Sequence, residues 1–130
     1  MNIPHGTLTF KIEGHVVHSH ADHSFNLEGM TLFFDQLFNI AATLDYWVLN
    51  IQLTEDVGIT PDALTYATEK ILLLADTGCL GVGSLIPSNI LQHLTKVVYE
   101  DNDIPQLSSS DSEEIDVFLE ELLAKHLKSN

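Results

Sequence analysis

The sequence predicts an α/β fold built on one mixed sheet. An alternating run and a second strand-like run flank a glycine turn near the N-terminus, and residues 46–53 form the most strand-like segment of the chain. After this segment, stretches with helical spacing alternate with short apolar runs, a pattern typical of parallel strands joined by helices. We therefore expect about five strands, an N-terminal antiparallel hairpin and about four helices.

The length and composition indicate a single domain over residues 1–130. A chain of 130 residues with 45% hydrophobic residues can bury a core without disulfides or metal. The single cysteine, Cys79, cannot form an internal disulfide, and its apolar neighbours predict a buried structural thiol.

The charge is strongly acidic and argues against two classes of partner. There are 19 Asp and Glu residues against 5 Lys and Arg, for a formal net charge of -14. The basic residues are scattered lysines, whereas phosphate recognition requires clustered Lys and Arg. We expect neither nucleic acid nor an anionic membrane surface as a partner. We see no signal peptide and no membrane-spanning apolar run, so the default expectation is a cytoplasmic protein.

The first elements follow from alternation and capping. Residues 7–13 alternate apolar and polar side chains, and Gly14 can take the positive φ of a tight hairpin. Residues 15–20 then read as the returning strand. Asn26 is suited to cap a helix that continues to about residue 44, with apolar side chains at helical spacing.

The central segment is apolar on both faces near its middle, as in a strand covered on two sides. A loop over residues 54–59 follows, and then Thr60 and Pro61 suit the N-cap and first turn of a second helix. Gly78 is suited to end that helix.

The last third of the chain is predicted as strand, helix, edge strand and helix. Residues 79–86 read as a strand, although two glycines count against it. A third helix over 88–97 and a loop over 98–103 precede a short edge strand at 104–108. Ser110 and Glu113 fit a capping box that opens the last helix.

Four short motifs, in this order and spacing, resemble small bacterial SpoIIAA-like proteins of the STAS/SEC14 type. They are His5-Gly6, Glu13-Gly14, Ser24-Phe25-Asn26-Leu27-Glu28-Gly29 and Thr60-Pro61-Asp62-Ala63. The resemblance covers residues 4–127. It implies a STAS-like fold and leaves the activity open, since most close relatives are uncharacterised.

The resemblance implies a protein-interaction role for the loop and helix start at 54–62. In anti-sigma-factor antagonists this loop binds a kinase, which phosphorylates a serine in the first helical turn. The Asp-Ser-Ser-Gly type motif is missing here, and Thr60 is the only hydroxyl at a comparable place. Thr60 acting only as a helix cap is the interpretation we favour. The candidate partner-binding residues are Thr54, Glu55, Asp56, Thr60 and Asp62.

SEC14-like relatives imply a second role, the binding of an apolar small molecule or lipid. The side chains that would line such a site are Phe33, Phe34, Phe38, Tyr46 and Trp47. Core packing explains the same residues equally well.

One histidine-rich segment matches the metallo-β-lactamase signature His-x-His-x-Asp-His. It comprises His18, His20, Asp22 and His23. The later ligands of that family would have to come from His93 and His126, which fall in predicted helices, and the chain is too short for that fold. We favour ordinary strand and loop histidines, with adventitious zinc or nickel binding as the alternative.

No nucleophile elbow or phosphate-binding glycine loop is present. The sequence therefore predicts a non-enzymatic regulatory or protein-interaction domain without a cofactor. A binder of an apolar molecule is the alternative, and a zinc hydrolase is the remote one. Edge strands also favour a homodimer.

Overall fold

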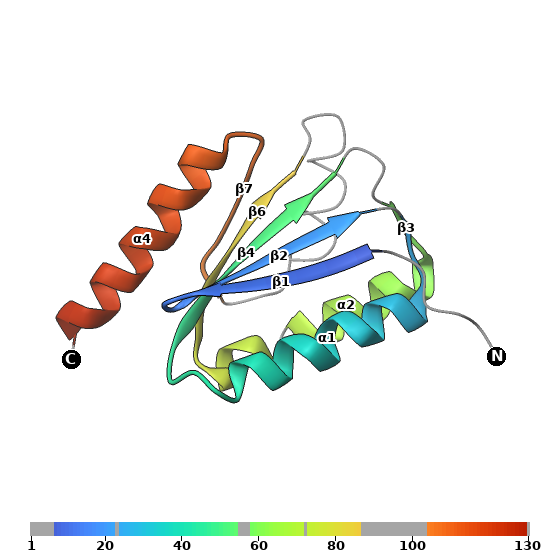
Figure 1. Ribbon diagram of the computed structural model, residues 1–130, viewed down its shortest axis with the longest axis horizontal. Coiled ribbons are helices and arrows are strands. Elements are labelled where there is room, and N and C mark those ends of the chain that lie inside the picture. Colours follow the sequence, from blue (N-terminus) through green and yellow to red (C-terminus); the bar gives the residue numbers. More distant parts are fainter. Residues whose placement is uncertain (1–6, 23, 55–57, 72, 87–103, 130) are drawn as a thin grey trace.

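A five-stranded mixed sheet forms the centre of the molecule, in the order β1-β2-β4-β6-β7 (Figure 1). The computed structural model describes residues 7–22, 24–54, 58–71, 73–86 and 104–129. The strands are β1 (Thr7–Glu13), β2 (Val16–Asp22), β4 (Trp47–Leu53), β6 (Cys79–Leu85) and β7 (Gln106–Ser109). The first pair is antiparallel, and the other three neighbouring pairs are parallel. This confirms the predicted α/β class and the mixed sheet.

Helices cover both faces of this sheet (Figure 1). Helices α1 (Leu27–Ala41) and α2 (Pro61–Ile71) lie against one face, and α4 (Ser112–Ser129) lies against the other. The described residues thus contain three α-helices, and the predicted helix at 88–97 falls outside them. Within the described part of the chain, no helix combines the length and apolar character needed to cross a membrane.

The central strand is covered on both sides, as its sequence predicts. Trp47 and Leu49 pack toward α1 and α2, whereas Val48 packs toward Ile115 and Leu119 of α4. Trp47, Val48 and Leu49 have no exposed surface. The indole nitrogen of Trp47 donates a hydrogen bond to the carbonyl oxygen of Thr77 at 3.0 Å, so the one polar atom of this large side chain is satisfied.

The two glycines of β6 explain how α4 reaches the sheet. A Cβ atom at Gly83 would lie 2.7 Å from Cγ2 of Ile115, and one at Gly81 would collide with Cδ1 of Leu122. Glycine at these positions therefore permits close packing of helix on strand. The glycines that count against a strand in the sequence are instead what allows this strand to carry a helix.

A second, two-stranded sheet was not predicted. Strands β3 (Ser24–Phe25) and β5 (Gly58–Ile59) pair in parallel beside the main sheet. The carbonyl oxygen of Phe25 also accepts a hydrogen bond from the Thr60 amide at 3.0 Å. Two residues cannot display an alternating pattern, so strands this short leave no periodic signal in a sequence.

Capping was predicted correctly for one helix and wrongly for another. The side chain of Asn26 accepts a hydrogen bond from the Gly29 amide at 2.9 Å and caps α1. The last helix is capped by Asp111, whose carboxylate accepts from the Glu113 amide at 3.0 Å, and not by Ser110. The edge strand extends one residue further than expected, to Ser109. The hydroxyl oxygen of Ser109 accepts a hydrogen bond from the Asp111 amide.

The second helix also ends earlier than predicted. Helix α2 stops at Ile71, and a 3-10 turn (Leu74–Thr77) follows. Gly78 closes that turn with a φ of 91°, a left-handed conformation that glycine adopts without strain. The glycine therefore ends the helical segment where expected, although the segment is made of two parts.

Candidate functional site

Polar side chains cross three strands in register on the face of the sheet that carries α4. Lys11 on β1 lies opposite His18 on β2, and His18 lies beside Asn50 on β4. The second row runs from Thr9 through His20 to Gln52. Alternation produces these rows, because the apolar residues between them on β1 and β4, Phe10 and Ile51, turn to the α1 and α2 face.

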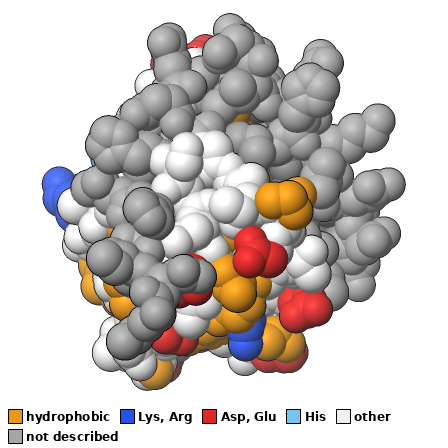
Figure 2. Space-filling view, turned by 90° about the vertical axis from the view of Figure 1, so that its right-hand side faces the viewer, with side chains coloured by type: hydrophobic (Ala, Val, Ile, Leu, Met, Phe, Trp, Pro, Cys, Tyr) orange, Lys and Arg blue, Asp and Glu red, His pale blue; other side chains and the backbone are white. Residues whose placement is uncertain are grey.

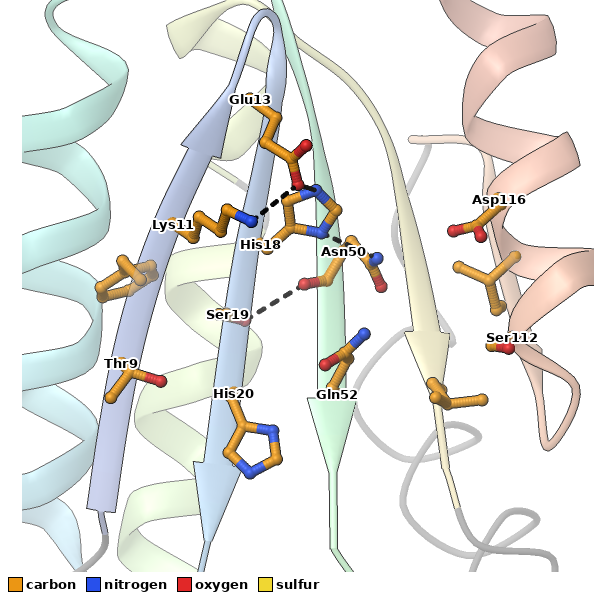
Figure 3. A pocket seen from close by; sticks show the side chains of 13 residues that line it. Thr9, Lys11, Glu13, His18, Ser19, His20, Asn50, Gln52, Ser112 and Asp116 are labelled. Carbon is orange, nitrogen blue, oxygen red and sulfur yellow. Dashed lines mark hydrogen bonds and ion pairs between the residues drawn. The ribbon is translucent and has the colours of Figure 1, made fainter.

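A pocket of about 590 Å³ lies over these rows (Figure 3). Helix α4 packs on β4, β6 and β7, and its first turns form one wall of the pocket through Ser112, Ile115 and Asp116. In Figure 3, Asp116 lies on the helix side and Glu13, His18 and Asn50 lie on the strand side. The polar lining includes Lys11, Glu13, His18, Asn50, Gln52 and Asp116.

A chain of polar contacts orders the strand side of the pocket. Nζ of Lys11 lies 3.5 Å from Oε1 of Glu13, and the same oxygen lies 3.2 Å from Nε2 of His18. Nδ1 of His18 lies 3.1 Å from Nδ2 of Asn50. The NH₂ group of Asn50 can only donate, so Nδ1 of His18 accepts from it and Nε2 donates to the carboxylate.

This arrangement leaves the carboxamide oxygen of Asn50 unsatisfied. The residue is only 3% exposed, and its Oδ1 has no hydrogen-bond partner among the described residues. A buried acceptor without a partner costs about 1–3 kcal/mol. Native proteins rarely retain such a group, so the unpaired oxygen marks a place where a donor is expected.

Asn50 was not among the residues singled out from the sequence, although a signal was present. Asparagine is depleted in strands, yet it stands in the middle of the most strand-like segment of this chain. Lys11, Glu13 and Gln52 were also missed. They read as ordinary solvent-facing strand residues until the register brings them together.

The histidine-rich segment contributes two side chains, His18 and His20, to this pocket. His18 and His20 lie on the face of β2 that lines the pocket. The ring nitrogens of His18 contact Glu13 and Asn50. Asp22 is the last residue of β2, and His23 lies outside the described residues. Among the residues that the structure describes, no three His, Cys, Asp or Glu side chains are grouped to hold a metal ion.

The predicted interaction segment at 54–62 lies at the end of the central strand. Glu55 and Asp56 lie outside the described residues, whereas Thr54 directly follows β4. The hydroxyl of Thr60 donates to Oδ1 of Asp62 at 2.6 Å and lies 3.4 Å from the Ala63 amide. The hydrogen bond from Thr60, with backbone amides as further donors, lowers the pKa of the Asp62 carboxyl. These contacts are those of a helix N-terminus.

The aromatic residues proposed to line an apolar site do not form one group. Phe33, Phe34 and Trp47 are buried in the core between the sheet and helices α1 and α2, and Phe38 packs against this core. Tyr46 lies apart from that core set. Its ring stacks on His15 at 3.9 Å and lies 4.4 Å from the ring of His126.

The described lysines belong to separate elements, namely β1, α2 and the end of α4. Figure 2 shows one face of the molecule on which acidic side chains lie among apolar ones and the visible basic side chains are isolated. Lys11 of the pocket is itself paired with Glu13.

Comparisons with known proteins add no relative to this description. No protein-family model, no curated protein and no solved structure matches the chain.

Proposed function

We propose that the protein is a non-enzymatic binding domain that holds a small polar molecule in the pocket between β1, β2, β4 and the start of α4. The pocket volume of about 590 Å³ lies within the range of small-molecule sites. Its floor is fixed by three hydrogen-bonded strands, so the polar side chains are presented from a rigid surface.

The single observation that carries this proposal is the buried oxygen of Asn50. Asn50 lines the pocket, its amide nitrogen is directed to His18, and its buried oxygen has no partner in the described structure. A purely structural position in a covered strand would favour an apolar side chain. A bound molecule that donates a hydrogen bond would supply the missing partner.

The contacts of His18 favour binding over catalysis. A general base needs a ring nitrogen whose lone pair can take a proton from the reacting group. Here Nε2 faces Glu13 and Nδ1 faces the Asn50 amide. Because both ring nitrogens contact other residues of the protein, the imidazole links Glu13 to Asn50 and holds the Asn50 amide in one orientation.

This proposal keeps the non-enzymatic class expected from the sequence, but it places the binding surface at the pocket instead of at residues 54–62. A partner-binding role for residues 54–62, including phosphorylation of Thr60, stays a prediction. The binding of an apolar molecule also stays a prediction. The polar lining described here favours a polar molecule instead.

A thermal-unfolding screen with small polar molecules tests the proposal. The wild-type protein, Asn50→Leu and the matched control Asn39→Leu are compared, since Asn39 is an exposed residue of α1 on the other side of the sheet. A ligand present at a hundred times its Kd stabilises the native state by about 2.7 kcal/mol. At least one compound should raise the unfolding midpoint of wild type and Asn39→Leu but not of Asn50→Leu. A screen without such a compound contradicts the proposal.

A further inference from the structure

We infer that the molecule bound in this pocket is a small organic cation that carries N–H donors, such as a primary ammonium or a guanidinium group. This inference rests on the proposed binding function and assigns the chemical class of its ligand. It is supported by the orientation of the Asn50 amide and by the charges on the pocket walls.

The orientation of the Asn50 amide determines that the ligand must be a donor. Glu13 is an acceptor, so the His18 nitrogen that faces it, Nε2, carries the proton. The other nitrogen, Nδ1, then offers a lone pair, which the NH₂ group of Asn50 meets at 3.1 Å. Turning the amide over would place two acceptors against each other. The oxygen is therefore the group of this pocket-lining residue that is left without a partner among the described residues.

Charge decides between a neutral donor and a cationic one. Glu13 and Asp116 bring two carboxylates to the pocket from opposite walls, and Lys11 brings the one ammonium among the described lining residues. Lys11 is already close to Glu13 at 3.5 Å. The carboxylates of Glu13 and Asp116 and the ammonium of Lys11 sum to one negative charge, in a chain whose net charge is -14. A cation is thus favoured locally and by the field of the whole protein.

The same features disfavour anions. A phosphate or carboxylate ligand offers acceptors, which cannot pair with the buried Oδ1 of Asn50. Such a ligand would also approach Asp116 against like-charge repulsion. The polar side chain of Gln52 lies on the same strand face as Asn50, two residues along β4. Its carboxamide can accept a further hydrogen from an ammonium or guanidinium group.

Four probes of similar size separate these chemistries in NMR titrations of the full chain. They are butylammonium, butyltrimethylammonium, butyramide and butyrate. The first two carry the same charge, but only butylammonium has N–H donors. Butyramide has the donors without the charge, and butyrate has the opposite charge. We expect butylammonium to bind at least tenfold more tightly than each of the other three.

Two substitutions locate the binding. Asn50→Leu removes the acceptor, and Asp116→Lys reverses an exposed charge on the helix wall without touching the core. Each should weaken butylammonium at least tenfold, whereas the control Asp35→Lys on the exposed side of α1 should change its affinity less than twofold. The Asp116 variant keeps the test decisive even where the Asn50 variant does not fold.

The outcomes distinguish the ligand class from the function beneath it. Preference for butyramide or butyrate, or equal binding of butyltrimethylammonium, overturns the cation assignment and leaves a polar binding pocket. The absence of saturable butylammonium binding at the pocket overturns the assignment as well. The proposed function itself fails only when the broader thermal screen also finds no compound that depends on Asn50.

Discussion

Among single residues, the pocket depends most on Asn50, one carboxamide in a strand that is otherwise fully apolar at its covered positions. Val48 and Leu49 behave as their neighbours in sequence predict, and both are fully buried. Asn50 is buried as well, yet one of its polar atoms lacks a partner among the described residues. A buried acceptor without a partner lowers the stability of a fold, and a residue of this kind in a central strand is best explained by function.

This view predicts that Asn50→Leu makes the unliganded protein more stable. The substitution removes a buried unsatisfied oxygen and adds apolar surface to a site beside Ile115, at the loss of one bond to His18. We expect the free energy of unfolding in urea to rise by about 1 kcal/mol. The exposed control Asn39→Leu should stay within about 0.5 kcal/mol of wild type. A loss of more than about 1 kcal/mol for Asn50→Leu would show that the oxygen is satisfied in the native protein.

The cysteine gives a second residue-scale prediction. Burial raises the pKa of the Cys79 thiol from 9.0 to about 12. The neutral thiol contributes stability below pH 9.0 that is lost as the pH rises toward about 12. At pH 8 an alkylating reagent should label the native protein at the slow rate of unfolding and label the urea-unfolded protein rapidly. Rapid, complete labelling of the native protein would contradict the buried placement.

At the scale of elements, the contact between β6 and α4 is the tightest test of the fold. Gly83→Ala places a methyl group 2.7 Å from Cγ2 of Ile115, and overpacking of this kind costs about 1–3 kcal/mol. Ile115→Ala removes Cγ2, the atom that the new methyl group would meet. In a double-mutant cycle measured by urea denaturation, the double variant should be more stable than the sum of the single changes predicts. Simple additivity would contradict the packing described here.

The start of α2 offers an element-scale prediction about capping. Thr60→Ala removes the hydroxyl that contacts the Asp62 carboxylate and lies near the Ala63 amide. The free energy of unfolding should fall by about 1 kcal/mol. The control Thr65→Ala lies on an exposed position within the same helix and should be neutral or slightly stabilising.

The acid dependence of this cap follows from the lowered pKa of Asp62. Its carboxylate stabilises the native state above its ordinary pKa of 3.8, and that contribution is lost as the pH falls through the lower native value. Circular dichroism follows the thermal unfolding of the wild type, Thr60→Ala and the control Thr65→Ala at pH 7 and in acid. An unchanged stability of Thr60→Ala at pH 7 would contradict the capping role.

Most elements could be predicted because their signals are local. The hairpin around Gly14, the Asn26 cap and the apolar central strand each depend on a few neighbouring residues. The paired strands at Ser24–Phe25 and Gly58–Ile59 are too short to show a period, and each exists only because the other is adjacent. The choice of Asp111 over Ser110 as a cap was a difference of one residue at a helix end, where several side chains compete.

At the scale of the whole molecule, the two faces of the sheet are covered unequally. Helices α1 and α2 bury apolar residues from β1 to β6, whereas the α4 contacts are made on β4, β6 and β7 (Figure 1). The polar rows from β1 and β2 therefore border the first turns of α4. Residues 9–20, 50–52 and 112–116 become one site only through the strand order and the position of that helix.

This is why the pocket could not be predicted from sequence. Lys11, His18 and Asn50 are aligned by the register of two strand pairs, and a shift of one residue in either pair would turn a side chain to the opposite face. The histidine signature in the sequence falls on β2, the strand whose His18 and His20 line the pocket, although it was noted for a different reason. The signature was considered as a set of metal ligands, and the contacts that the structure describes for His18 are to the Glu13 carboxylate and the Asn50 amide.

The most direct test follows the side-chain amide of Asn50 by NMR while butylammonium is added. Because Nδ2 lies 3.1 Å from Nδ1 of His18 and the residue is buried, its two amide protons should give distinct signals that exchange slowly with water. We predict a saturable shift of these signals that fits the same Kd as the backbone signals of Gln52 and Asp116, with the amide of Asn39 unchanged. Asn50 signals that stay fixed while the added cation shifts other parts of the protein would contradict the account.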